Sequence, residues 1–326
     1  MTVNESLADA SDALTVSAMA VYTVAMLAFL ANLAAAGSPA PRMAPGGALV
    51  AAGGGPAPDS TSSPEPLGES PESAPARRSR VGGVAVGVLI LATGLHLGAV
   101  AARGLAAGRV PWSNAYEFAL TGSLAVAVLA VALVVRRDQR WLGAFVVLPV
   151  LLTLGLATAV FYAETTALAP ALQSFWLVIH VSVAFIASAL FTVSFSLSVL
   201  QLTQQRADAG AAAGRPRPAL LRAVPGTDLL EAGAFRLNAV GFVLWSFTLI
   251  AGAIWAEHAW GRYWGWDPKE VWSLVIWVVY AGYLHARVTA GWGGRRAAWL
   301  AVAGYGCLLF NFFGVNYLFS GLHSYA

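Results

Sequence analysis

Eight apolar stretches, each about twenty residues long, constrain the fold of this chain more than any other feature. They cover approximately residues 15–36, 82–102, 116–135, 142–160, 175–202, 236–255, 271–290 and 297–319. A helix of about 20 apolar residues spans the ~30 Å hydrocarbon core of a membrane. Charged residues make up only 11% of the chain, whereas about a quarter is usual in soluble proteins. The sequence therefore predicts an all-α polytopic membrane protein with about eight transmembrane helices.

The segment between the first two stretches, residues 37–80, has a different composition. It holds nine of the sixteen prolines and many glycines and serines, and it lacks periodic apolar residues. Such a segment cannot bury enough apolar surface to order itself. We therefore expect an N-terminal transmembrane anchor (1–36), a disordered cytoplasmic linker (37–80) and a compact seven-helix membrane domain (81–326).

The positions of lysine and arginine predict the orientation of the helices. If the N-terminus is outside, fifteen of the nineteen basic residues fall in inner connections. Those that remain outside are Arg103, Arg109, Arg262 and Lys269. Cytoplasmic connections of membrane proteins carry an excess of Lys and Arg. Both termini are therefore expected to be extracytoplasmic, together with an outer loop at about residues 256–270.

That loop is unusually rich in tryptophan and reads WGRYWGWDPKEVW (260–272). Six of the twelve tryptophans fall within twenty-three residues: Trp255, Trp260, Trp264, Trp266, Trp272 and Trp277. The ordinary explanation is an interfacial aromatic belt, which spreads its residues over all helix ends. The clustering of these residues argues against a belt.

The five histidines divide between the outer face and the membrane interior. His180 lies near the outer end of the fifth stretch, and His323 and His258 lie in the outer tail and loop. His96 and His285 are intramembrane. A hydrogen bond within the bundle explains a lone histidine equally well, and for His258 it is the better explanation. Imidazole is a good iron ligand, however, and two imidazoles give a six-coordinate haem. Because His180 and His323 converge on the tryptophans, they predict a haem site.

Haem also accounts for the charged residues of the loop and constrains the other histidines. Indole faces can stack on the flat porphyrin, and Arg262 and Lys269 could neutralise its propionates.

The helices that carry His96 and His285 enter the membrane from opposite sides, so the two side chains are expected to lie ~12 Å apart in depth. Two axial nitrogens lie only ~4 Å apart across one iron. We therefore expect His96 to be structural, or to lie near the outer site, rather than to pair with His285.

Several motifs resemble those of haem-handling proteins of cytochrome c maturation. WGRYWGWD (260–267) resembles the WWD signature of that superfamily. PWSNAYEF (111–118), FWLVIHV, YLHAR and GLHSY resemble further motifs of its ResC/CcsA branch, in the System II pathway. The resemblance covers about residues 81–326. This chain departs from the family pattern at Trp112 and Ala115, where the family has leucine.

The resemblance implies a role for each matching residue. His180 and His323 match the two outer histidines that hold haem iron. His285 matches an intramembrane haem ligand, and its second ligand is expected from a partner protein. The residues that match the signature itself are Trp260, Trp264, Trp266 and Asp267. No catalytic residue is assigned beyond those that position haem.

The resemblance also implies the function, which is c-type cytochrome biogenesis in the plasma membrane of a bacterium. Such proteins bring haem b to the outer face of the membrane, where thioether bonds join it to the CxxCH motif of apocytochrome c. They act with a ResB-type membrane partner, and indirectly with a thiol-reducing, thioredoxin-like protein; no nucleic acid is involved. We expect the chain to be a subunit of a cytochrome c synthase (haem lyase).

Two alternatives remain open. The chain could export haem, or another flat apolar ligand, without ligase activity. It could also be a non-haem scaffold whose tryptophans pack against a partner subunit. Holocytochrome production in a host without its own maturation system distinguishes a synthase from an exporter. A haem spectrum that survives replacement of His180 would favour the scaffold.

Overall fold

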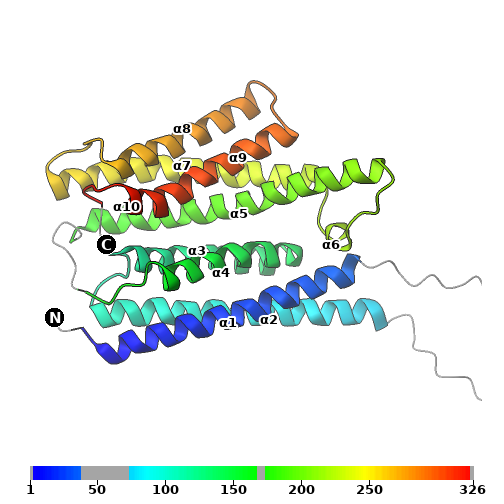
Figure 1. Cartoon of the computed structure of the whole chain (residues 1–326), viewed down its shortest axis with the longest axis horizontal. Helices are drawn as coiled ribbons and strands as arrows, with labels where there is room; N and C mark the ends of the chain where they lie inside the picture. Colours follow the sequence, from blue (N-terminus) through cyan, green and yellow to red (C-terminus); the bar gives the residue numbers. More distant parts are fainter. Residues whose placement is uncertain (1–2, 38–72, 167–172, 324–326) are drawn as a thin grey trace, which may run out of the picture.

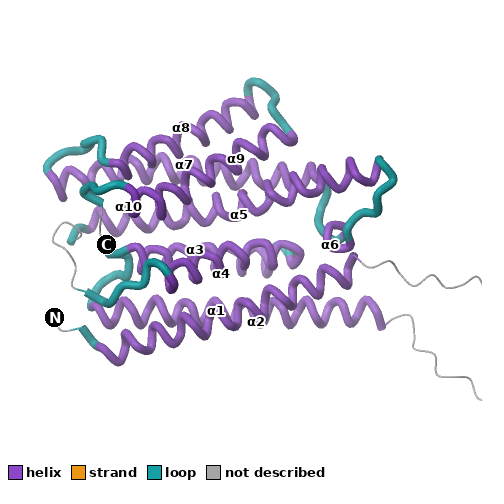
Figure 2. Tube along the Cα trace, viewed as in Figure 1, coloured by secondary structure: helices purple, strands orange, loops and turns teal. Residues whose placement is uncertain are grey.

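The computed structural model describes residues 3–37, 73–166 and 173–323, without the side chains of 73–79. Within these ranges the chain is helical and has no strand (Figure 2). Most of the linker expected at 37–80 lies outside the described residues.

Within the described residues, eight helical segments are long and apolar enough to cross a membrane, as the sequence predicts. Seven of them are α1 (Glu5–Gly37), α2 (Ser73–Ala107), α3 (Ala115–Arg136), α4 (Gly143–Ala159), α5 (Phe175–Ala212), α7 (Thr227–Trp260) and α8 (Pro268–Val288). The eighth consists of α9 (Gly294–Leu309), the π-helical turn η3 (Phe310–Gly314) and α10 (Val315–Leu318). The fourth span also includes the short helix η1 (Arg140–Leu142), which directly precedes α4, and the short helix α6 (Ala219–Arg222) lies in the connection between α5 and α7. Helix α2 begins at Ser73, within the segment that the sequence assigned to the linker.

The helices lie side by side in two groups, α1–α4 and α5–α10 (Figure 1). The most extensive contacts join α1 to α2 and α5 to α7, while α3 and α4 connect the groups through α5. The start of α1, the end of α10 and the α7–α8 loop lie at the same end of the bundle (Figure 1). We call this the tryptophan end, because residues 260–267 lie there.

Helix α1 packs along the bundle, so the linker is not its only attachment. Its buried positions recur every three or four residues and are Ser11, Thr15, Ala18, Tyr22, Ala25, Phe29, Leu33 and Gly37. They face α2, whose buried positions include Ala85, Ala92 and Ala99. Small side chains let two membrane helices approach closely, and this approach gives the pair its van der Waals contact.

The pairing of α1 with α2 also encloses His96, which is fully buried. Its Nδ1 lies 3.3 Å from the hydroxyl of Tyr22, and its Nε2 lies 2.9 Å from the carbonyl oxygen of Leu120 on α3. A carbonyl only accepts, so Nε2 donates and Nδ1 accepts from Tyr22. Both nitrogens of His96 are therefore engaged within the first helix group.

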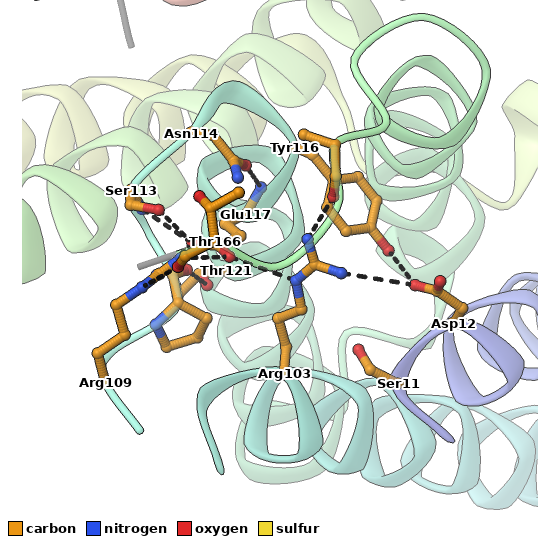
Figure 3. Close-up of polar contacts among 12 residues, drawn as sticks. Ser11, Asp12, Arg103, Arg109, Ser113, Asn114, Tyr116, Glu117, Thr121 and Thr166 are labelled. Atoms are coloured by element: carbon orange, nitrogen blue, oxygen red, sulfur yellow. Dashed lines mark hydrogen bonds and ion pairs between the residues drawn. The ribbon is translucent and has the colours of Figure 1, made fainter. Parts of the chain in front are cut away.

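A buried ion network fixes the tryptophan end of this group (Figure 3). Glu117 of the PWSNAYEF motif is fully buried, and Arg109 contacts its Oε2 at 2.6 Å and Arg103 its Oε1 at 3.3 Å. The same carboxylate accepts the backbone N–H of Ser113 at 2.9 Å. Arg103 also reaches Asp12 on α1, at 3.9 Å. A buried carboxylate requires such compensation, and here the compensation positions the loop that precedes α3.

Candidate functional site

The loop between α7 and α8 comprises residues 261–267, fewer than the expected 256–270, because α7 continues to Trp260. Gly261 ends α7 with a φ of 70°, in the left-handed region that glycine adopts without strain. Trp266 also has a positive φ, 58°. The loop therefore turns sharply at both of its ends.

Asp267 begins α8 and ties it to the tail of the chain. Its Oδ1 accepts the N–H of Lys269 at 3.1 Å. Its side chain also accepts the backbone N–H of Glu270, while Glu270 Oε2 accepts the N–H of Asp267 at 3.0 Å, and these two bonds form a capping box. Asp267 Oδ1 also accepts Nδ1–H of His323 at 2.8 Å, and Oδ2 accepts the N–H of Leu322 at 2.6 Å. One carboxylate thus fixes His323 relative to α8.

The hydrogen bonds of Asp267 also set its charge. Burial raises the pKa of a carboxyl group, but the hydrogen bond and the charge of His323 act in the other direction, as do the backbone N–H groups of Leu322 and Lys269. The net result is a pKa for Asp267 below its ordinary value of 3.8. Asp267 is therefore a carboxylate at neutral pH.

His180 approaches the same place from α5. Its Nδ1 lies 2.9 Å from the carbonyl oxygen of Thr248 on α7. Its ring is nearly parallel to that of Trp255, with the centroids 6.1 Å apart and an angle of 10°. Trp255 also meets His323 edge-on, at 5.6 Å, and Trp260 packs edge-on against both Trp255 and His323, at 4.7 and 4.8 Å. Both histidines therefore contact one indole.

The hydrogen bonds determine which nitrogen of each neutral ring carries the lone pair. The partners of His180 and His323 are a carbonyl and a carboxylate, which only accept, so Nδ1 carries the hydrogen in both rings. The basic nitrogen of each is then Nε2. Metal-binding histidines usually donate their other N–H to such an acceptor, which fixes the ring and raises its basicity. In both side chains, Nε2 is therefore the nitrogen whose lone pair could bind a metal.

His180 and His323 line one cavity, whose empty space of about 1010 Å³ includes volume open to solvent. The large aromatic residues of its wall are Trp112, Phe118, Trp245, Trp255, Tyr263, Trp264 and Phe312. Among the described residues, no group of three or more His, Cys, Asp or Glu side chains is placed to hold a metal ion. Iron bound here by two imidazoles would need four further ligands, which the porphyrin nitrogens supply in haem.

A second cavity, of about 850 Å³, adjoins the first between α3, α4, α5 and α9. The residues that line both cavities are Trp112, Phe118, Lys269, Phe312 and His323. Phe312 belongs to the π-helical turn η3 in the eighth span. Such turns are frequent at functional sites. The turn therefore forms part of the partition between the two cavities.

The two cations predicted for the site differ in placement. Lys269 lines both cavities, and its Nζ lies 6.0 Å from the ring centroid of Phe118 and 5.9 Å from that of Phe312. In the part of the chain that the structure describes, Lys269 forms no ion pair. Arg262 is exposed and lies against Gly265, outside the walls of both cavities. Lys269 is therefore the cation within reach of a ligand in the cavity.

The other residues singled out from the sequence lie in several places. Trp264 lines the first cavity, whereas Trp266 is 72% exposed and meets Trp264 edge-on. His258 is exposed, with its Nδ1 2.8 Å from the carbonyl oxygen of Ile254. His285 is exposed in the last turn of α8, about 27 Å along the helix from Asp267 at 1.5 Å per residue. It does not belong to the cavity of His180 and His323.

Sequence reasoning missed Trp112, Phe118, Phe312 and Glu270 as part of the cavity wall. Trp112 was visible as a departure from the family pattern, but nothing in the sequence indicated that it lines the same cavity as His180. Phe312 lies in an apolar stretch, where an aromatic residue carries no signal of its own. Glu270 follows Asp267 by three residues, which is the spacing of a capping box. That pattern could have identified Glu270 as a residue that caps the start of α8.

Comparison with known proteins identifies the family. Residues 112–323, from the first tryptophan of the cavity to His323, match the family of cytochrome C assembly proteins. This chain belongs to that family. It is similar to the cytochrome c biogenesis protein CcsA of Synechococcus elongatus, 36% identical over 270 residues that cover 69% of this chain and 81% of the relative. It is also similar to CcsA of Gloeothece citriformis, 34% identical over 288 residues that cover 74% and 86% of the two chains.

Membership confirms the resemblance to the CcsA type that the motifs indicated. It gives this multi-pass membrane protein a role in cytochrome c biogenesis and implies that it handles haem. How the individual residues would handle haem is a separate question, which depends on the geometry of the cavity.

Proposed function

We propose that this cytochrome c assembly protein holds haem b between His180 and His323 and presents it for thioether attachment to the CxxCH motif of apocytochrome c. One observation carries the proposal. Both imidazoles donate Nδ1–H to fixed acceptors and line the same aromatic cavity, so that both Nε2 atoms are basic. Two such nitrogens can hold the iron from opposite faces of a porphyrin.

The propionates of haem fit two groups, one without an ion pair and one without a hydrogen-bond acceptor among the described residues. The ammonium of Lys269 lies among aromatic rings without an ion pair to any described residue, and a cation in such surroundings favours a bound anion. The indole N–H of Trp112 is buried and has no acceptor among the described residues. A propionate oxygen would satisfy both. Because the vinyl groups of haem lie away from its propionates, the vinyl edge would then face away from Lys269.

This chain's contribution to the reaction is chiefly positioning. His180 is fixed by Thr248 and Trp255, and His323 by Asp267 and Trp260. When the histidine of the apocytochrome displaces one of these ligands, the porphyrin stays held by the other and by the indoles. Holding two reactants in an orientation suited to bond formation can supply several kcal/mol of the barrier, on the order of 7–11 in the best cases.

We also propose the setting in which the protein acts. The distribution of Lys and Arg favours an extracytoplasmic tryptophan end, and similarity to CcsA of Synechococcus elongatus favours a bacterial membrane, for which we propose the plasma membrane. The exposed position of His285 suits a second haem site completed by a ligand from a ResB-type partner. A thioredoxin-like protein would keep the apocytochrome thiols reduced.

The experiment that tests the proposal begins with purification of the protein, with and without a ResB-type partner, followed by an absorption spectrum. Low-spin, six-coordinate haem that is lost in His180→Ala and His323→Ala supports the site. Holocytochrome formation in a host without its own maturation system supports the synthase. The adjoining second cavity would also suit a haem exporter, and for that function haem would bind but no holocytochrome would form.

A further inference from the structure

The cavity of His180 and His323 contains one buried acid that haem binding does not explain. Glu270 lines this cavity and is 8% exposed. Its Oε2 accepts the N–H of Gly265 at 2.8 Å and the N–H of Asp267 at 3.0 Å, which fixes the carboxyl group. Its Oε1 is buried and has no hydrogen-bond partner in the described part of the chain. A buried polar atom without a partner is unusual in a folded protein.

Asp267, the buried acid at the end of the loop, differs from Glu270. Both oxygens of Asp267 accept hydrogen bonds, from Lys269 and His323 at Oδ1 and from Leu322 at Oδ2. Of the described residues that line either cavity, Glu270 alone carries a carboxyl group. One carboxylate oxygen at the proposed haem cavity is therefore free to act on a substrate.

Haem cannot provide the partner that Glu270 Oε1 lacks. Its iron is matched by the two Nε2 atoms, and its propionates, which accept, are matched by Lys269 and Trp112. Iron porphyrin has no N–H of its own, since all four pyrrole nitrogens bind the metal. A carboxylate oxygen needs a donor. The donor therefore has to come from the second substrate or from water.

The second substrate carries such donors. A CxxCH segment has two cysteine thiols, each with an S–H, and its peptide N–H groups. Asn311 on η3 is a further buried acceptor at the same cavity, since its Oδ1, with the amide oriented as in the structure, has no partner among the described residues. A peptide with several donors can satisfy Glu270 and Asn311, whereas haem alone satisfies neither.

From these contacts we propose that Glu270 is a catalytic residue that transfers the proton during thioether formation, an inference that rests on the proposed function. The carboxylate removes the proton from the cysteine S–H, and an electron pair of the sulfur forms the bond to the vinyl carbon next to the porphyrin ring. The π electron pair of the vinyl group takes that proton from Glu270 at the terminal carbon, which becomes a methyl group. The S–H and C=C π bonds break, C–S and C–H bonds form, and the iron keeps its oxidation state.

The substitution Glu270→Gln tests this assignment without removing the cap of α8. The glutamine oxygen can still accept the N–H groups of Gly265 and Asp267, but the side chain cannot carry a proton between substrates. We expect the purified variant to keep the six-coordinate haem spectrum of the wild type. Holocytochrome formed per haem-loaded protein should fall by about 100-fold, at the lower end of typical contributions from general acid–base catalysis. The matched control is Glu257→Gln, in an exposed side chain at the same end of the bundle, and it should match the wild type.

A pH profile separates proton transfer from a structural role. With a reduced CxxCH peptide and haem-loaded protein, the slow reaction of Glu270→Gln should recover as the pH approaches the ordinary thiol pKa of about 8.5. There thiolate forms without a base, and water supplies the proton to the terminal vinyl carbon. Unchanged holocytochrome formation in Glu270→Gln would overturn the assignment. So would loss of haem together with activity, or a low rate that does not recover at high pH. Failure of the wild type to bind haem would instead refute the proposed function.

Discussion

Nδ1 of His323 lies 2.8 Å from Oδ1 of Asp267, across a separation of fifty-six residues in sequence. The carboxylate that begins α8 therefore also selects the tautomer of a histidine in the tail. In the WWD signature of this chain, the aspartate positions an iron ligand in our account and does not itself bind haem. This distinction leads to different expectations for the aspartate and for the histidines.

Asp267→Asn should weaken haem binding without unfolding α8. The amide oxygen can still cap the helix, but its bond to His323 loses the charge of the carboxylate. Changes to groups that orient a metal ligand typically cost about 10–100-fold in affinity. The expected loss is measured by absorbance titration of the purified protein with haem. Asp138→Asn, in the exposed connection that follows α3, is the control, and equal affinities for the two variants would contradict the positioning role.

The charge of Asp267 should stabilise the protein in a defined pH range. Because its folded pKa lies below 3.8, its contribution is fully present above that value and is lost as the pH falls through the lowered folded pKa. Hydrogen bonds to charged groups are worth about 1.5–3 kcal/mol, so Asp267→Asn should lower the unfolding free energy by about this amount at pH 5. Denaturation in detergent should show the difference between the two proteins shrinking only below pH 3.8. A full difference at pH 2 would disagree with the lowered pKa.

Lys269 and Arg262 should contribute unequally to haem affinity. Lys269 lines the cavity and Arg262 does not, so Lys269→Met should reduce affinity by about 10-fold or more, the equivalent of about 1.4 kcal/mol. Arg262→Met should leave it nearly unchanged. The comparison is made by haem titration of both variants. The reverse order would show that propionates lie in the loop, as the sequence alone allowed.

His96 should matter for stability and not for haem. Its replacement by phenylalanine removes the donor to Leu120 and the acceptor for Tyr22, which should cost about 1–3 kcal/mol of unfolding free energy. The haem spectrum should remain that of the wild type. A variant with normal stability and an altered spectrum would indicate that His96 is a ligand.

The positions of the spans could be predicted because apolar length alone determines what crosses a membrane. The packing of α1 could not, since α1 and α2 recognise each other through small residues such as Ala18 and Ala92, which are common in any membrane helix. In the loop, side-chain directions do not follow a helical period. Trp266, with its positive φ, therefore points outward and Trp264 inward, although both belong to one motif. That His180 and His323 lie near one another was predictable from topology, but the acceptor of His180 was not, because Thr248 contributes only a backbone carbonyl.

The most direct test of the central claim is the spin state of haem in protein purified on a His285→Ala background, in which the proposed intramembrane site is removed. The account predicts low-spin, bis-imidazole haem when His180 and His323 are intact. It predicts loss of that spectrum in either His180→Ala or His323→Ala, with recovery on addition of imidazole. A low-spin spectrum that persists in both variants would contradict it.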